Sequence, residues 1–235
     1  MNSKSSTAAV VIVLAAALNY ATTVPCQAQS VPATHLRQGV TLAQTKHADV
    51  DGDGRLDAVR IYNAGTKKDL TNWLVKVTTA TGRVSSVKFP IPTYQTDKPW
   101  YGSARLDGHR GAELLFETHS DDGLGLEVLT WRDGKLRTEK APASPSDLTQ
   151  KWGTWFAAEE GSANSGYRFF TSGGHRYVNA WGATCPAGGK ACTLNTVRSV
   201  WRDGAWHRVA VLRAEKVAAQ VVLKRHPLGA LKVHS

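Results

Sequence analysis

Residues 49–57 read Asp49-Val50-Asp51-Gly52-Asp53-Gly54-Arg55-Leu56-Asp57 and are the most informative stretch of the chain. Carboxylates stand at positions 1, 3, 5 and 9 of this stretch, with glycine at position 6 to permit a sharp turn. Ca²⁺ takes about six to eight oxygen ligands, and alternate residues of a tight loop can turn their side chains inward to supply them. The spacing therefore predicts a calcium loop with carboxylate ligands and one backbone carbonyl ligand: Asp49, Asp51, Asp53 and Asp57 through side chains, and Arg55 through its carbonyl.

The residues after the loop exclude an EF-hand. That motif needs a bidentate Glu at position 12 and a helix on each side, whereas position 12 is Arg60. Residues 58–63 alternate apolar with polar or small side chains, which is typical of a half-buried strand. The alternative is a solvated Asp/Gly turn without an ion. Carboxylates packed this closely would repel one another without a counter-ion, so we expect a loop–strand calcium motif.

The N-terminus has the pattern of a secretory signal peptide. Lys4 supplies a positive charge, residues 8–18 are apolar, and Cys26-Gln27-Ala28 offers small residues around a cleavage site. A membrane anchor, a buried helix or a lipidated Cys26 is the alternative. We expect a signal peptide over 1–28, a polar lead over 29–46, a single β domain over 47–235, and secretion without a transmembrane segment in the mature chain.

Two cysteines remain after cleavage, Cys185 and Cys192. An even pair in an exported chain predicts a disulfide, here across a flexible turn. Zinc binding is the rival interpretation, but no second Cys pair or His pair stands nearby at zinc-ligand spacing.

Short alternating runs punctuated by Gly, Asp-Gly and Pro predict a chain of β-strands. Their spacing of roughly eight to twelve residues is typical of sandwiches, barrels and propellers. Residues 214–220 are good helix formers but 221–223 are strand-like, so the end of the chain stays undecided. The expected strands are 58–62, 73–78, 83–89, 112–117, 126–131, 135–140, 155–159, 167–170, 176–181, 196–201 and 206–212.

Two sequence matches indicate an internal repeat. Trp-Arg-Asp-Gly occurs at 131–134 and again at 201–204, each time before an alternating run. Residues 105–113 also align with 49–57, although Arg105 and His109 replace the acids at positions 1 and 5. We expect this second loop to keep the turn without an ion, with Arg105 or Arg110 supplying the positive charge.

The acidic loop and the apolar strand after it resemble FG-GAP/VCBS repeats, the calcium-loop units of integrin-type β-propellers. The match is specific over residues 49–63 and degenerate over 105–117. The resemblance implies an all-β fold of short antiparallel meanders, with a small β-propeller-like or incomplete-propeller architecture and structural Ca²⁺. Four blades would fit the chain, as would two such units beside another β-domain.

No catalytic motif is present: the chain has no G-x-S-x-G, no H-E-x-x-H and no phosphate-binding glycine loop. The main prediction is therefore an extracellular binding module. The alternatives are a polysaccharide-active hydrolase and, given the formal net charge of +10, a basic wall-associated polyanion binder. A hydrolase would need paired carboxylates beside an aromatic platform. The candidate acids are Glu113, Glu117, Glu127, Glu159 and Glu160.

Expected partners are an extracellular glycan, an anionic wall polymer or a protein, and no specific nucleic acid. We expect the strand tryptophans to pack in the core, because their large apolar area favours burial. Trp100 and Tyr101 come after Pro99 in an expected loop. Because loops carry function more often than strand interiors, these two are the candidate ligand contacts.

Overall fold

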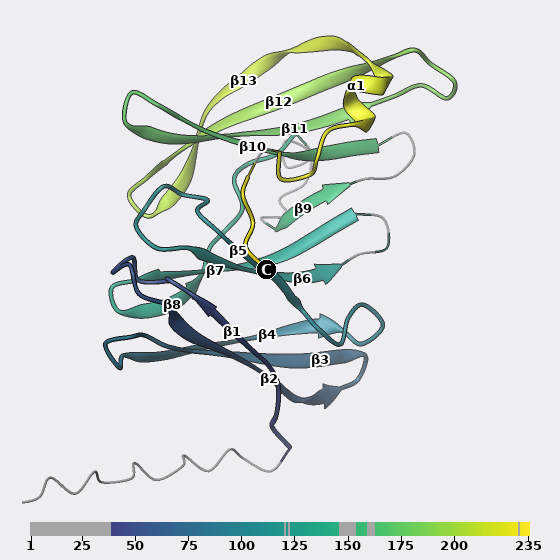
Figure 1. The fold of residues 1–235 in the computed structure, drawn as a ribbon. Coiled ribbons are helices and arrows are strands. Elements are labelled where there is room, and N and C mark those ends of the chain that lie inside the picture. Colours follow the sequence, from purple (N-terminus) through teal and green to yellow (C-terminus); the bar gives the residue numbers. More distant parts are fainter. Residues whose placement is uncertain (1–38, 120, 122, 146–153, 159–162, 230) are drawn as a thin grey trace, which may run out of the picture. The chain divides into compact units, whose positions relative to one another are not determined.

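The computed structural model describes residues 39–119, 121, 123–145, 154–158, 163–229 and 231–235. Residues 1–28, including the expected signal peptide, lie outside this part of the chain. The described residues form antiparallel sheets, none of them closed, and confirm the predicted all-β class (Figure 1). None of the described helices is long and apolar enough to cross a membrane.

The described strands form three sheets, each made of strands consecutive in the sequence. In sheet 1 the order is β1 (Thr41–Ala48), β2 (Asp57–Lys67), β3 (Leu70–Thr78) and β4 (Val84–Pro92). In sheet 2 it is β5 (Trp100–Ala104), β6 (Glu113–His119), β7 (Gly123–Arg132) and β8 (Lys135–Thr138), and β9 (Trp155–Ala158) also pairs with β7. In sheet 3 it is β10 (Ala163–Ser172), β11 (His175–Thr184), β12 (Ala191–Arg202) and β13 (Ala205–Ala218), and helix α1 (Ala219–Leu223) comes after β13.

Sheet 2 is buried on both faces, which the sequence of β6 explains. Leu114, Leu115 and Phe116 are all fully buried, but neighbouring residues of a strand point to opposite faces. Leu114 and Phe116 belong to the core shared with sheet 1, whereas Leu115 belongs to the core shared with sheet 3.

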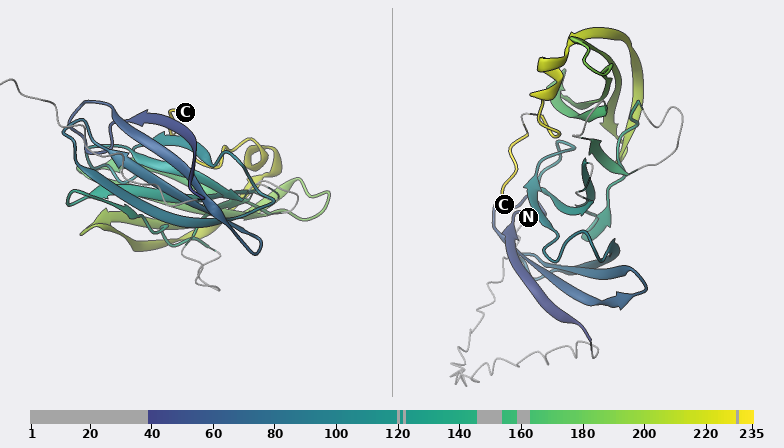
Figure 2. Two further views of the ribbon diagram at one scale, coloured as in Figure 1. Left: turned by 90° about the horizontal axis from the view of Figure 1, so that it is seen from below. Right: turned by 90° about the vertical axis from the view of Figure 1, so that its right-hand side faces the viewer.

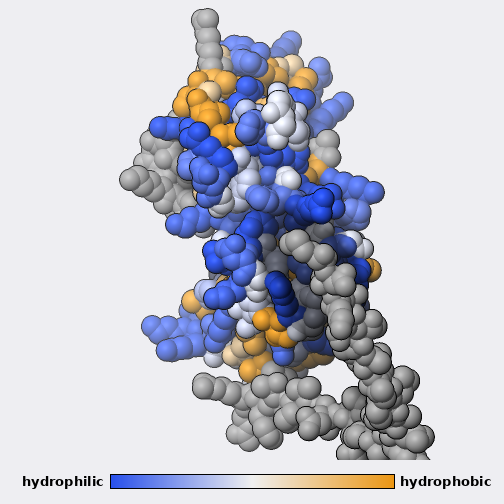
Figure 3. All heavy atoms as spheres, turned by 90° about the vertical axis from the view of Figure 1, so that its left-hand side faces the viewer, coloured by the Kyte–Doolittle hydropathy of each residue, from blue (hydrophilic) through white to orange (hydrophobic). Residues whose placement is uncertain are grey.

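On the face shown in Figure 3, hydrophilic residues cover most of the described surface and hydrophobic residues form separate patches.

The two Trp-Arg-Asp-Gly turns occupy the same place in their sheets. Each joins the third strand to the fourth, β7 to β8 and β12 to β13. Asp133 and Asp203 have φ values of 52° and 50°, and the adjacent Gly134 and Gly204 have 72° and 74°. Positive φ at both central residues is the requirement of a tight hairpin turn, so the repeated tetrapeptide marks a repeated structural position.

Two strands differ from the sequence prediction. β1 begins at Thr41, inside the expected polar lead, and its largely exposed polar residues give no alternating signal. Trp100 and Tyr101 lie on β5 and not in a loop, so that expectation was wrong. Pro99 before them and the small residues after them conceal this short strand.

The C-terminal segment lies along the first strands of sheets 2 and 3, as the contacts and Figure 2 show. The Tyr167 amide of β10 donates to the carbonyl of Pro227 over 2.6 Å, and Ser103 of β5 exchanges backbone hydrogen bonds with His234. The segment thereby covers strand edges that would otherwise be unpaired.

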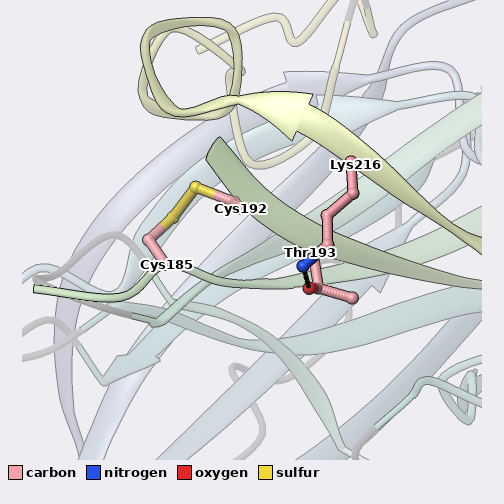
Figure 4. Close-up of a disulfide and its surroundings, with 4 residues drawn as sticks. All are labelled: Cys185, Cys192, Thr193 and Lys216. Carbon is pink, nitrogen blue, oxygen red and sulfur yellow. Dashed lines mark hydrogen bonds between the residues drawn. A yellow bond between two sulfur atoms is a disulfide. The ribbon is translucent and has the colours of Figure 1, made fainter. Parts of the chain in front are cut away.

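The predicted disulfide is present between Cys185 and Cys192. It joins the end of β11 to the start of β12 (Figure 4), where the Lys216 ammonium also donates to the Thr193 hydroxyl over 2.8 Å. Cys192 is fully buried in a small core that includes Trp181 and Val222. The end of the chain contains both strand and helix, since β13 runs to Ala218 and α1 comes directly after it.

Candidate metal centre

The acidic loop joins β1 to β2, and its own carboxylates hold its backbone. Asp49 accepts hydrogen bonds from the amides of Gly52 and Gly54, at 2.8 and 3.1 Å. Gly52 and Gly54 have φ values of 77° and 86°, a conformation that favours glycine. Asp51 and Asp53 each accept from the amide two residues ahead. Backbone amides of the loop therefore donate hydrogen bonds to the loop's own carboxylates.

Asp57, the first residue of β2, anchors the loop to sheet 1. Its side chain is fully buried, and its two oxygens accept from the amides of Val50 and Ala80, both at 2.8 Å. Ala80 belongs to the turn between β3 and β4. One carboxylate therefore ties the loop to another turn of its own sheet.

Three of the predicted ligands converge. One carboxylate oxygen from each of Asp49, Asp51 and Asp57 lies within 4.8 Å of the other two. Asp53 and Arg55 are exposed and stand outside this group. Partial burial raises the pKa of Asp51, and the negative charges of Asp57, Asp53 and Asp49 raise it further. These carboxylate oxygens are hard donors and repel one another, so a cation such as Ca²⁺ would suit the site.

The loop of residues 105–112, between β5 and β6, repeats these backbone contacts. The Leu106 amide donates to Glu113 Oε2 over 2.7 Å, as the Val50 amide does to Asp57. The His109 amide donates to Asp107 Oδ1, as the Asp53 amide does to Asp51. The alignment of 105–113 with 49–57 therefore corresponds to a shared three-dimensional arrangement.

Arg132, at the end of β7, supplies the positive charge in this second loop. Its guanidinium pairs with the Asp107 carboxylate and lies 3.4 Å from Glu113 Oε1. The expectation that Arg105 or Arg110 fills this role was wrong, because Arg132 makes these ion pairs while Arg105 and Arg110 are exposed. In the sequence Arg132 belongs to a turn motif, and nothing local connects it with a loop more than twenty residues earlier.

A third acid, Glu139, completes a buried cluster that the sequence did not reveal. Ligand oxygens of Asp107, Glu113 and Glu139 lie within 4.8 Å of one another. Glu139 Oε1 accepts from Trp206 Nε1 over 3.0 Å, whereas its buried Oε2 has no hydrogen-bond partner within the described structure. Burial, with the nearby Asp107 carboxylate, raises the pKa of Glu113 to about 7. Burial and the charges of Glu113 and Asp107 also raise the pKa of Glu139 well above its usual range.

The two loops contact each other, and the second loop also contacts sheet 3. The Ala112 amide donates to the Asp49 carbonyl over 2.8 Å, and a Cβ at Gly111 would stand 2.3 Å from the Val50 carbonyl oxygen. On the other side, Arg176 of β11 donates to the Leu106 carbonyl over 2.8 Å. The first loop therefore lies against the second where sheets 1 and 2 meet.

The other candidate residues serve different roles or lie apart. Trp100 packs edge-on against Phe116, with ring centroids 5.6 Å apart, in the core between sheets 1 and 2. Tyr101 packs against the core between sheets 2 and 3. Of the strand tryptophans expected in the core, Trp73, Trp131, Trp155, Trp181 and Trp201 are buried, whereas Trp206 on β13 is only partly buried and packs against the core between sheets 2 and 3.

The described acids that were considered for a hydrolase, Glu113, Glu117 and Glu127, lie apart from one another. Glu113 is in the buried cluster, Glu127 accepts from the Thr138 hydroxyl over 2.7 Å, and Glu117 lines neither of two cavities, of about 920 and 210 Å³. The smaller cavity has Trp201 beside Asp107, the single carboxylate of its described lining. Glu159 and Glu160 lie outside the described residues.

Comparisons with known proteins found no family model, curated protein or solved structure that matches this chain.

Proposed function

We propose that this chain is a secreted calcium-binding β-repeat protein that acts as a binding module outside the cell, with Ca²⁺ in a structural role. The observation that carries the proposal is the convergence of Asp49, Asp51 and Asp57 in a loop with the predicted ligand spacing. In this proposal Asp53 and the Arg55 carbonyl, which are exposed on the same loop, complete the coordination.

The resemblance to FG-GAP/VCBS repeats supports an incomplete propeller in which each sheet is a blade. Each sheet is a meander of consecutive antiparallel strands, and the acidic loop joins the first two strands of sheet 1. The hydrogen bonds shared by the two loops support common descent of blades 1 and 2. The signal-like pattern of residues 1–28 and the Cys185–Cys192 disulfide support an oxidising extracellular compartment in this proposal.

Calcium would act by neutralising the first loop and fixing its contact with the second. An ion that binds only the folded state stabilises it by mass action, by about 2.7 kcal/mol when free Ca²⁺ is about 100-fold above Kd. We expect melting in excess Ca²⁺ to occur several degrees above melting in EDTA, with Mg²⁺ as a parallel arm. Asp51→Ala should abolish the difference.

Asp69→Ala is the matched control, because Asp69 is an exposed acid of sheet 1 outside the loop. It should keep the full calcium response. An unchanged melting temperature in Ca²⁺ and EDTA for the parent chain would remove the calcium claim.

A further inference from the structure

A cavity of about 920 Å³ lies between sheet 2, with β9, and sheet 3. It is at the opposite end of β6 from the acidic cluster, since Glu113 begins that strand and His119, which lines the cavity, ends it. Ligand pockets of about 300–1,000 Å³ are common for small organic molecules. Neither acidic loop contributes to its described lining.

Neutral polar groups dominate the polar part of this cavity. Its described lining includes the hydroxyls of Ser144, Thr154 and Thr184 and the amides of Asn164 and Asn195, and contains no Asp, Glu, Lys or Arg. Asn164 is 7% exposed, and its Nδ2 has no hydrogen-bond partner within the described structure. Hydroxyls and amides can both donate and accept hydrogen bonds. These hydroxyls and amides are therefore suited to a ligand with many hydroxyl groups.

Aromatic rings supply the apolar part. Trp155, Tyr167 and Trp181 line the cavity from strands of both sheets but are only 3%, 2% and 5% exposed, so Phe156, which is 36% exposed, is the most accessible of these rings. The Tyr167 hydroxyl is engaged with the backbone amide and carbonyl of Phe156, both at 3.1 Å, so β9 is held against β10. The aromatic wall is thus fixed before a ligand arrives, which reduces the entropy lost on binding.

Gly182 keeps part of the wall open. It lies on β11 without a positive φ, and a Cβ at this position would meet only Pro145, at 3.7 Å. A side chain could therefore project at this position without backbone strain. Valine at 182 should fold and reduce the space for a ligand.

We propose that this cavity binds one or two rings of a neutral saccharide. This inference rests on the proposed role as an extracellular binding module and names its ligand class. A sugar ring presents apolar C–H faces to aromatic rings and hydroxyls to Asn and Thr side chains, which is the combination found here.

The test is binding of cellobiose, maltose and N,N′-diacetylchitobiose to the full chain, detected by saturation-transfer NMR and quantified by titration calorimetry. Gly182→Val should weaken binding at least tenfold. Asn195→Ala, which removes an exposed polar side chain from the lining, should weaken it about fivefold, the effect of one hydrogen bond. Ser86→Val, an exposed strand position in sheet 1, is the control and should bind as the parent does.

Each result decides the inference. It is overturned if none of the three sugars binds, if only an anionic polymer such as heparin binds, or if Gly182→Val retains the parent's melting temperature and full affinity. Titrations in Ca²⁺ and in EDTA separate this outcome from that of the calcium proposal. If the chain binds sugar but its melting temperature does not depend on Ca²⁺, the saccharide proposal stands and the calcium proposal fails.

Discussion

The guanidinium of Arg132 pairs with the carboxylate of Asp107, the residue that occupies in the second loop the position of Asp51 in the first. Two loops with the same backbone hydrogen bonds thus differ in how their acids are neutralised. In the second loop the cation is part of the chain. In the first, we propose that it is Ca²⁺.

Replacing Arg132 with methionine should destabilise the protein strongly. The change leaves Asp107 and Glu113, both 1% exposed, without the guanidinium that pairs with them, and only the more distant charge of Arg176 remains. Breaking a buried ion pair by removing one partner costs about 3–5 kcal/mol. Urea unfolding measures this loss.

Arg202→Met is the matched control. Arg202 has the same place in the second Trp-Arg-Asp-Gly turn but is exposed, so its replacement should change the free energy of unfolding by no more than about 0.5 kcal/mol. Equal losses in both variants would contradict the assigned role of Arg132.

Stability should fall as pH rises from about 4.5 to 7 because of Glu113, and Glu139, whose pKa is also raised by burial, should add to the loss as pH rises from the same lower limit. Both groups have raised pKa values in the folded state, so they hold protons there that the unfolded chain has already released. Asp107 and Arg132 face the same cluster, and Trp206 donates to Glu139.

Glu139→Gln replaces one of these titrating carboxyls with an amide that stays neutral at every pH. It should flatten the pH dependence and stabilise the protein most at alkaline pH, as measured by urea unfolding from about pH 5 to 9 in saturating Ca²⁺. Glu117→Gln, on the same sheet, serves as the control. A Glu139 variant whose stability runs parallel to that of the parent at every pH would refute this explanation.

Gly111→Ala should disrupt the contact between the two loops. Gly111 has a φ of 92°, and an added Cβ would stand 2.3 Å from the Val50 carbonyl oxygen. Gly82→Ala has the same conformational cost, about 1–2 kcal/mol, but its Cβ would enter open space. Thermal melting should therefore show a clearly larger loss for Gly111→Ala, and a loss no greater than that of Gly82→Ala would argue against the close approach.

Removing the disulfide should have a moderate effect, because the loop that it closes is short. Changing Cys185 and Cys192 together to alanine should lower the free energy of unfolding by about 2–3 kcal/mol. Reduction of the parent chain should produce a comparable loss. A parent chain that melts identically with and without reductant would show that the bridge contributes nothing.

Apolar alternation in the sequence predicts the later strands of each sheet, because one or both of their faces are buried. β1 and β5 escape detection, since β1 is largely exposed and β5 is short and rich in small residues. The acidic loop is recognisable because its carboxylates are close in sequence. Arg132 and Glu139 cannot be recognised as partners of Asp107 from the sequence, because only folding brings them close to it. The cavity is likewise built from separate strands of two sheets, which no local pattern could reveal.

The number of calcium ions bound per chain tests the central claim most directly. Equilibrium dialysis of the full chain against Ca²⁺ should give one ion, held by the loop of residues 49–57. Asp51→Ala should give none, and Asp107→Asn should leave the number at one, because Arg132 already serves the second loop. No bound calcium in the parent chain, or a second ion that Asp107→Asn removes, would contradict the account.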